Sequence, residues 1–287
     1  MLPWIEKYRP SELEDIILDK KYKILFDTIV DNLDFPHLLF YGPPGSGKTT
    51  TIVCLIHKII KKYNMKHNII HLNASDERGI DIIRNTIYTF VNSNNIYNSI
   101  NKKFIILDEV DSMTKNAQQS LLTLFNNENV HFCLICNYIS KLIPTIRNST
   151  LTINFCNIEN YRSYINNIIQ KENIKIDDTI INDILYNYYP DLRSIVNALQ
   201  SYTYLNTNFI KQKYIINICK TKNFSNLKKY IKIFHKNDFL CKLFLHIVEE
   251  YKTDETLILY MKEIIFHDLD IDFIEYVFME YFFKLQN

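Results

Sequence analysis

A glycine-rich segment constrains the fold of this chain more than any other feature, because its residue types and both of its neighbours fit one structural pattern. The segment reads Gly42-Pro-Pro-Gly-Ser-Gly-Lys-Thr49, follows the short apolar run 36–41 and precedes residues 49–63, where apolar residues recur at helical spacing. This arrangement matches the pattern G-x-x-x-x-G-K-T between a strand and a helix. All the fixed positions are present, which disfavours a chance glycine-rich turn. The sequence therefore predicts a strand, a loop and a helix in an α/β domain.

Phosphate binding is the chemistry that this loop indicates. Glycines let backbone N–H groups approach phosphate oxygens closely, and the N-terminus of the following helix adds positive potential. We expect Lys48 to reach the β- and γ-phosphates of a nucleotide and the Thr49 hydroxyl to ligate Mg²⁺. The candidate nucleotide-binding residues of the loop and the helix start are Gly42, Pro43, Pro44, Gly45, Ser46, Gly47, Lys48, Thr49 and Thr50.

A pair of carboxylates follows another short apolar run. Residues 105–107 are Ile-Ile-Leu, and Asp108 and Glu109 come directly after them. We expect Asp108 to hold Mg²⁺ through water, and Glu109 to orient and deprotonate the attacking water, since phosphoryl transfer depends mainly on positioning and charge neutralisation. The alternative is a solvated acidic turn.

Further apolar runs organise the rest of the chain. Residues 68–72, 103–107 and 132–136 each read as a short buried strand with helix-like segments between them, which predicts a mostly parallel sheet covered on both faces. Beyond about residue 155 strand signals stop, and helical periodicity marks residues 161–171, 178–188, 192–205, 227–234, 239–251 and 273–285. We therefore expect three domains: an α/β nucleotide-binding domain at 1–155, a small helical domain at 156–206 and an all-helical domain at 207–287.

Composition narrows the class of protein further. The net charge of the 287 residues is +1, so any contact with nucleic acid must be local. Among six cysteines, the close pair Cys133 and Cys136 lies in an apolar run, which favours a buried strand over a metal site. No apolar stretch is long enough to span a bilayer, and the first residues do not resemble a signal peptide. We expect a soluble protein of a reducing, intracellular compartment with no membrane partner.

Further segments carry a more specific signal than the glycine-rich loop. They are Trp4-Ile-Glu-Lys-Tyr-Arg-Pro10, Asn73-Ala-Ser-Asp-Glu-Arg-Gly-Ile-Asp81, Ile106-Leu-Asp-Glu109, Met113-Thr114 with Ala117-Gln118, and Asn137-Tyr138 with Lys141-Leu142. In this order they resemble the small subunits of eukaryotic and archaeal replication factor C. The resemblance is dense to about residue 144 and thin afterwards. It implies an AAA+ P-loop ATPase module, followed by a helical lid and a helical collar through which five subunits assemble.

The same resemblance assigns roles to residues outside the loop. Asn137 matches the sensor 1 position, where its amide holds the hydrolytic water, and a strand-end turn is the alternative. Arg193 matches the sensor 2 arginine that faces the γ-phosphate, although Pro190 stands where the family has glycine; a surface arginine is the alternative. The segment Tyr8, Arg9 and Pro10 matches the lining of the base pocket. Arg84 and Lys141 match DNA-phosphate contacts, with solvated surface charges as the alternative.

The chain departs from the family pattern at three places. Ser149 stands where the family has the arginine that reaches into the neighbouring subunit's site, and Arg147, two residues earlier, could replace it only in a remodelled loop. Residues 121–123 are Leu-Leu-Thr in place of Leu-Arg-Arg, and Tyr88 stands at a position that is often lysine. A chain with a complete site but no such arginine suits an end position of the pentamer.

The resemblance implies an ATP-binding and ATP-hydrolysing small subunit of a clamp loader, which opens a sliding clamp of the PCNA type and loads it onto primer-template DNA during replication. Expected partners are the other clamp-loader subunits, the clamp and DNA, and the expected compartment is the nucleus, or a cytoplasmic replication compartment for a viral source. One alternative is a nucleotide-binding scaffold subunit with little turnover. Another is an AAA+ loader of a different target, such as a helicase. Segments 4–10 and 73–81 disfavour this second alternative, because they resemble replication factor C specifically.

Overall fold

The chain forms two compact units in the computed structural model, which describes residues 2–65, 68–75, 80–93, 102–156, 161–205, 209–221, 224–251, 253, 255–267, 271–278 and 280. The first unit comprises Met1–Lys175 and Tyr188–Thr203, and the second comprises Ile176–Asn187 and Tyr204–Asn287. This division differs from the three domains expected from the sequence, because two of the three helices expected in the middle domain lie in the first unit and one in the second. The boundaries at residues 155 and 206 stay a prediction.

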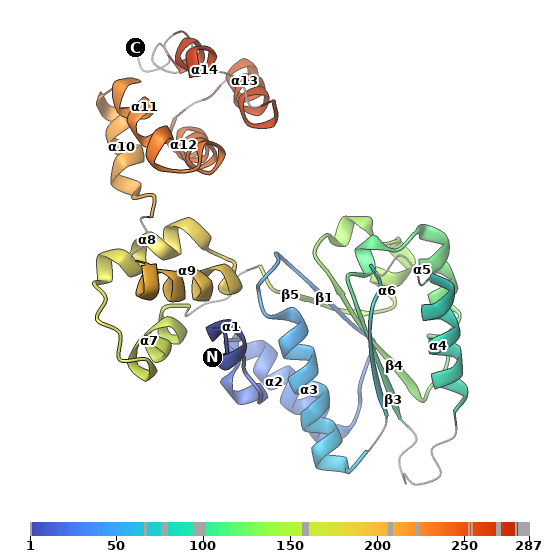
Figure 1. The fold of residues 1–287 in the computed structure, drawn as a ribbon. Coiled ribbons are helices and arrows are strands. Elements are labelled where there is room, and N and C mark those ends of the chain that lie inside the picture. The colour runs from blue at the N-terminus through green and yellow to red at the C-terminus, as the bar shows by residue number, and fades with distance from the viewer. Residues whose placement is uncertain are drawn as a thin grey trace. The chain divides into compact units, whose positions relative to one another are not determined.

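The first unit is built on a parallel sheet of five strands in the order β2-β3-β4-β1-β5 (Figure 1). The strands are β1 (Leu38–Tyr41), β2 (Ile69–Asn73), β3 (Lys103–Asp108), β4 (Val130–Cys136) and β5 (Leu151–Asn154). β3 and β4 are central and covered on both faces, which accounts for their nearly continuous apolar sequences. The strands predicted around residues 36–41, 68–72, 103–107 and 132–136 are present. β5, in which Ile153 alone is buried, was not predicted from the sequence.

Helices cover both faces of this sheet. The helices of the first unit are α1 (Trp4–Lys7), η1 (Leu13–Asp15), α2 (Lys20–Asn32), α3 (Lys48–Tyr63), α4 (Ile80–Asn92), η2 (Val110–Ser112), α5 (Lys115–Leu122), η3 (Ile139–Lys141), α6 (Pro144–Asn148), α7 (Tyr161–Lys171) and α9 (Leu192–Leu205). α2 and α3 lie on one face of the sheet, and α4, α5 and α6 lie on the other (Figure 1).

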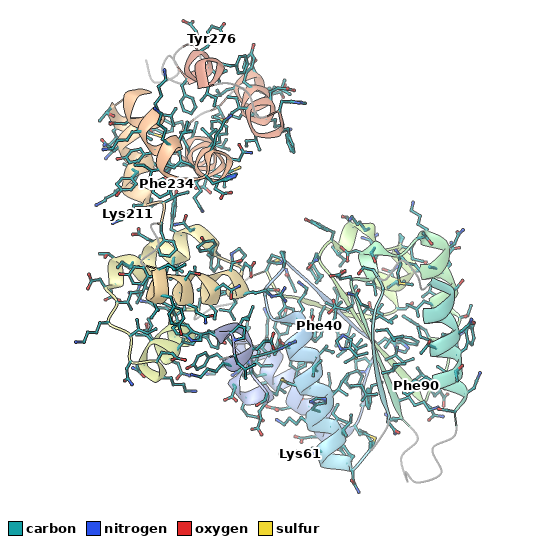
Figure 2. The ribbon with its side chains drawn as sticks, in the orientation of Figure 1. Phe40, Lys61, Phe90, Lys211, Phe234 and Tyr276 are labelled. Carbon is teal, nitrogen blue, oxygen red and sulfur yellow. The ribbon has the colours of Figure 1, made fainter. Side chains whose placement is uncertain are left out.

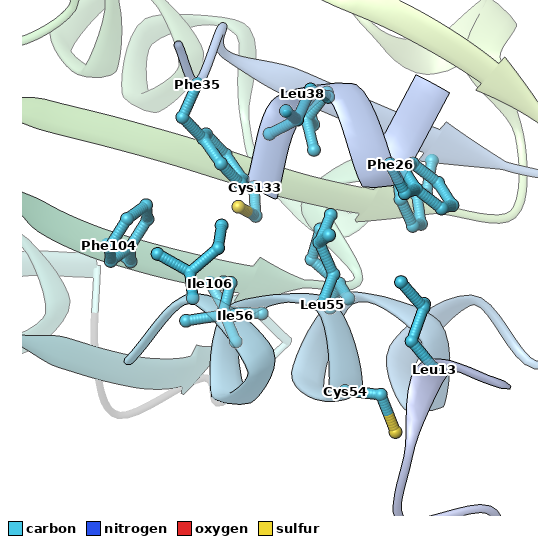
Figure 3. Packing of buried hydrophobic residues seen from close by; sticks show 14 of the residues in the cluster. Leu13, Phe26, Phe35, Leu38, Cys54, Leu55, Ile56, Phe104, Ile106 and Cys133 are labelled. Atoms are coloured by element: carbon cyan, nitrogen blue, oxygen red, sulfur yellow. The ribbon is translucent and has the colours of Figure 1, made fainter. Parts of the chain in front are cut away.

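Successive strand residues alternate between two hydrophobic cores, as the period of two of a strand requires. Phe104 and Ile106 of β3 pack with Phe26 and Leu55 in the core beneath α2 and α3, which Figure 3 shows. Ile105 and Leu107 join the core on the opposite face. Cys133 and Cys136 of β4 are both buried and belong to different cores, which confirms the buried strand expected there.

The second unit is helical. Its helices are α8 (Asp178–Tyr188), α10 (Gln212–Thr221), α11 (Phe224–Ile233), α12 (Lys236–Glu250), α13 (Glu255–Phe266) and α14 (Ile271–Val277). The buried face of α12, with Phe239, Leu243 and Ile247, forms the centre of its core. Phe234 stacks on Phe239 at 5.9 Å between ring centroids, whereas Tyr276 lies at the surface and is 51% exposed (Figure 2). Within the described part of the chain, no helix is both long and apolar enough to cross a membrane.

Candidate nucleotide-binding site

The glycine-rich loop connects β1 to the N-terminus of α3, at the carboxyl edge of the sheet. Gly47 caps α3 with a φ of 86°, and Gly45 has a φ of 69°, both in the left-handed region that favours glycine. A Cβ atom on Gly45 would lie 1.6 Å from Oδ1 of Asp191, so no larger residue fits there without a shift of its neighbour. The local sequence therefore sets both the path of the loop and its close approach to the segment before α9.

Lys48 connects this loop to the end of a neighbouring strand. Its side chain is buried, with 6% exposure, and its ammonium donates to the carbonyl oxygens of Gly42 (2.9 Å) and Pro43 (2.8 Å) and to Oδ1 of Asn137 (3.0 Å). Burial lowers the pKa of Lys48, and the negative charge of Asp108 opposes this shift. The structure thus brings together the lysine and the amide that the sequence analysis singled out.

Two oxygen donors meet beside the start of α3. The Thr49 hydroxyl donates to Oδ2 of Asp108 at 2.7 Å, and Oδ1 of Asp108 accepts from the backbone N–H of Glu109 at 2.9 Å. A hydroxyl and a carboxylate are hard oxygen ligands of the kind that Mg²⁺ prefers, so these two residues fit a magnesium site. Glu109 is exposed and has a φ of 55°, which is uncommon for a residue with a Cβ and often marks a functional site.

A buried glutamine fixes the segment that follows Asn137. Gln118 of α5 is 1% exposed, and its amide donates to the carbonyl oxygens of Met113 (3.1 Å) and Lys141 (3.3 Å). Its Oε1 atom accepts from the N–H of Ile143 at 2.9 Å. One side chain therefore satisfies three backbone groups. The signal in the sequence is a polar residue on the apolar face of α5, one position after the buried Ala117.

A cavity of about 180 Å³ lies beside the loop within the first unit. Its apolar wall consists of Ile5, Ile16, Ile17, Tyr164, Leu192 and Val196. The rest of the lining includes polar groups. It comprises residues 45–50 of the loop and of α3, with Arg9, Pro10 and Arg193. An apolar pocket next to a phosphate-binding loop suits the base and sugar of a nucleotide. Residues 15–17, at the end of η1 and just after it, were not predicted from the sequence, because this stretch has no distinctive pattern.

Tyr8 is not among the residues that line this cavity, and its expected place in the base pocket stays a prediction. Its hydroxyl donates to Oε1 of Glu172 at 2.6 Å, and Lys7 donates to the same oxygen at 2.6 Å. The hydrogen bond from Lys7, and then that from Tyr8, lowers the pKa of Glu172, so the carboxylate stays charged. Tyr164 donates to the carbonyl oxygen of Tyr8 at 2.7 Å. Tyr8 therefore contacts the cavity wall through Tyr164. Arg9 donates from Nε to the Thr50 hydroxyl at 3.2 Å.

Lys141 and Ser149, two of the remaining expected site residues, are exposed. Lys141 is exposed, with its ammonium 5.1 Å from the centre of the Tyr138 ring. The side chain of Arg84 lies outside the described residues, so both DNA-contact assignments stay predictions. Ser149 is exposed at the end of α6, and Nε of Arg147 is buried without a hydrogen-bond partner among the described residues.

The fold and this loop define a P-loop nucleotide-binding domain of the AAA class. Residues 38–157 match the family model described as "ATPase family associated with various cellular activities (AAA)", so the chain carries an AAA-family domain. The relatives to which the chain is similar include proteins named replication factor C subunit 3 and subunit 5.

Three relatives illustrate this similarity. The chain is 40% identical over 205 residues to the probable replication factor C subunit 5 of Dictyostelium discoideum, covering 70% of this chain and 59% of the relative. It is 39% identical over 204 residues to replication factor C subunit 3 of Schizosaccharomyces pombe, with the same shares. It is 37% identical over 204 residues to human replication factor C subunit 5, covering 70% of this chain and 60% of the relative. The chain thus spans about three fifths of the length of these relatives.

Solved structures support the fold. The Thermotoga maritima RuvB Holliday junction branch migration motor superposes with a TM-score of 0.52 at 16% identity, covering 91% of this chain and 80% of that one. A single-residue variant of the same protein gives a TM-score of 0.53 at 16% identity, covering 96% and 91%. At this level of identity the likeness shows a shared fold and carries nothing about function.

Proposed function

We propose that this chain is an ATP-binding and ATP-hydrolysing small subunit of a clamp loader, which opens a ring-shaped sliding clamp and loads it onto primed DNA during replication. The observation that carries the proposal is the convergence of Lys48, Thr49, Asp108 and Asn137 around one phosphate-binding loop. The similarity to replication factor C subunits supports a sliding clamp as the protein that is loaded.

Each group around the loop has a distinct part in ATP hydrolysis. Lys48 neutralises the charge of the phosphates, and the backbone N–H groups of the loop hold their oxygens. Thr49 and Asp108 would hold Mg²⁺, which would supply positive charge against the phosphates. Glu109 accepts the proton of the attacking water, Asn137 fixes that water through its amide, and Arg193 faces the γ-phosphate from α9.

The partners in this proposal are the other subunits of a hetero-pentamer, a clamp of the PCNA type and primer-template DNA, in the nucleus or in a cytoplasmic replication compartment. A net charge of +1 suits a subunit that shares DNA binding with its neighbours and contributes a few phosphate contacts, such as Arg84 and Lys141. Ser149 supports an end position in the pentamer, since the chain then donates no arginine to a neighbouring nucleotide.

The substitution Glu109→Gln tests the proposal. The amide keeps the shape of the side chain but cannot accept the proton, so the assembled complex should still bind ATP at this site. Hydrolysis at this site, measured with the other sites disabled, should fall by about a hundredfold or more. Glu128→Gln, an exposed glutamate after α5, is the matched control and should leave turnover unchanged. Equal turnover in Glu109→Gln and the parent would remove Glu109 from the reaction.

A further inference from the structure

Asp191 holds the first turn of α9 by its side chain. Its Oδ1 atom accepts from the backbone N–H groups of Arg193 (2.9 Å) and Ser194 (3.2 Å), and its Oδ2 atom accepts from the Ser194 hydroxyl at 2.8 Å. The first N–H groups of a helix have no partner within the helix, and an aspartate before the first turn is one of the preferred ways to satisfy them. Both carboxylate oxygens are therefore committed to α9.

The same residue lies directly against the phosphate-binding loop. The N–H of Leu192 donates to the carbonyl oxygen of Gly45 at 3.2 Å. The missing Cβ of Gly45 would lie 1.6 Å from Oδ1 of Asp191 and 3.3 Å from its Cα atom. The loop and the start of α9 are thus in contact at a point where the lack of a side chain on Gly45 makes room for the carboxylate.

Asp191 holds the backbone from which the Arg193 side chain extends. Arg193 is the second residue of α9 and lines the cavity beside the loop, and its own N–H is one of the groups that Asp191 accepts. Within the described part of the chain, Arg193 bonds Asp191 through its backbone N–H, so the direction of its side chain depends on the backbone that Asp191 holds. A guanidinium binds phosphate oxygens well only when its planar group is correctly directed.

We propose that Asp191 is a positioning residue of the nucleotide site, which fixes the first turn of α9 on the phosphate-binding loop so that Arg193 faces the phosphates. The proposal rests on the proposed function, because it needs a nucleotide in the cavity. It assigns Asp191 no contact with the nucleotide or with Mg²⁺, since both of its oxygens are taken by α9.

A double-mutant cycle on the full chain in its assembled complex tests this role, with ATP turnover and KM as the readouts. Asp191→Ala should lower kcat/KM by about tenfold in the parent background but by less than threefold in the Arg193→Ala background, because a positioning residue has no effect once the residue it positions is gone. Asp191→Asn keeps an oxygen that accepts from the helix N–H groups and should stay within about threefold of the parent. Ser194→Ala removes one side-chain bond and leaves the backbone contacts, so it is the matched control and should change kcat/KM by less than twofold.

The possible results separate this proposal from the function on which it rests. If Asp191→Ala lowers kcat/KM equally in both backgrounds, or not at all, Asp191 does not act through Arg193 and the proposal is wrong. If Asp191→Asn is as impaired as Asp191→Ala, the negative charge and not the capping contact matters, and the proposal is again wrong. If Lys48→Ala leaves turnover unchanged, both the proposed function and this proposal are wrong. If Lys48→Ala lowers turnover but the effects of Asp191→Ala and Arg193→Ala are additive, this proposal alone is wrong.

Discussion

Replacing His131 with Phe should remove a large part of the acid sensitivity of the first unit. His131 of β4 is 8% exposed and lies among the rings of Phe35 and Phe104, each with its centroid 5.7 Å away. Its Nε2 atom is buried without a hydrogen-bond partner among the described residues. Burial, and then the charge of Lys102, lowers the pKa of His131 from 6.5 to about 4. The folded state therefore holds this imidazole in its neutral form.

The size of the effect follows from this shift in pKa. In the unfolded chain the imidazole takes up a proton near pH 6.5, whereas in the folded chain it does so only near pH 4. The stability from neutral His131 is thus complete above about pH 6.5 and is lost as the pH falls toward 4. One pKa unit corresponds to about 1.4 kcal/mol, so His131 accounts for about 3 kcal/mol in total and about 2 kcal/mol between pH 7 and 4.5.

Urea unfolding at pH 7.5, 6.0, 5.0 and 4.5 measures this dependence. Trp4 is the single tryptophan of the chain and is buried in the first unit, so its fluorescence reports the unfolding of that unit. The comparison uses the pH dependence within each variant, so a change in packing caused by the phenylalanine does not affect it. His57→Gln, at an exposed position of α3, is the control and should keep the parent's dependence. The reasoning is refuted if His131→Phe loses as much stability as the parent between pH 7.5 and 4.5.

Two further predictions concern the segment from α5 to α6. Gln118→Ala removes the side chain that bonds the carbonyl oxygens of Met113 and Lys141 and the N–H of Ile143. It should reduce the free energy of unfolding by about 3 kcal/mol, since a buried group without a partner costs about 1–3 kcal/mol; equal urea midpoints for this variant and the exposed Gln119→Ala would contradict it. Arg147→Ala should change the DNA-stimulated turnover of the assembled complex by less than about tenfold, or about 1.4 kcal/mol in the barrier, if the chain donates no arginine to a neighbour. A loss of a hundredfold or more would show that Arg147 serves a neighbouring site, and the end-position proposal would fall.

The strands that build the site could be predicted because the central ones are apolar on both faces. β3 and β4 have nearly continuous apolar sequences, and β1 is identified by the glycine-rich loop that follows it. β5 could not be predicted in the same way. It is an edge strand of four residues in which Ile153 alone is buried, and it is held by parallel pairing with β1, which is distant in the sequence.

The site itself was predictable where one motif fixes the geometry. Lys48, Thr49 and Asp108 meet because the loop and the end of β3 lie at the same edge of a parallel sheet. Contacts between distant segments were not predictable. The bond of Tyr8 to Glu172 and the approach of Asp191 to Gly45 depend on how α7 and α9 pack beside the loop, which no local pattern records.

Binding of ATP to the full chain, with and without Lys48, tests the central claim most directly. Titration calorimetry with ATP and Mg²⁺ should show binding by the parent chain. Lys48→Ala should weaken it by about a hundredfold or more, or about 2.7 kcal/mol, because the variant loses the cation that neutralises phosphate charge. Lys58→Ala, on the same helix and paired with Glu14 at the surface, is the matched control and should bind as the parent does. Equal ATP affinity of Lys48→Ala and the parent, with both chains folded, would contradict the assignment of the loop as a nucleotide-binding site.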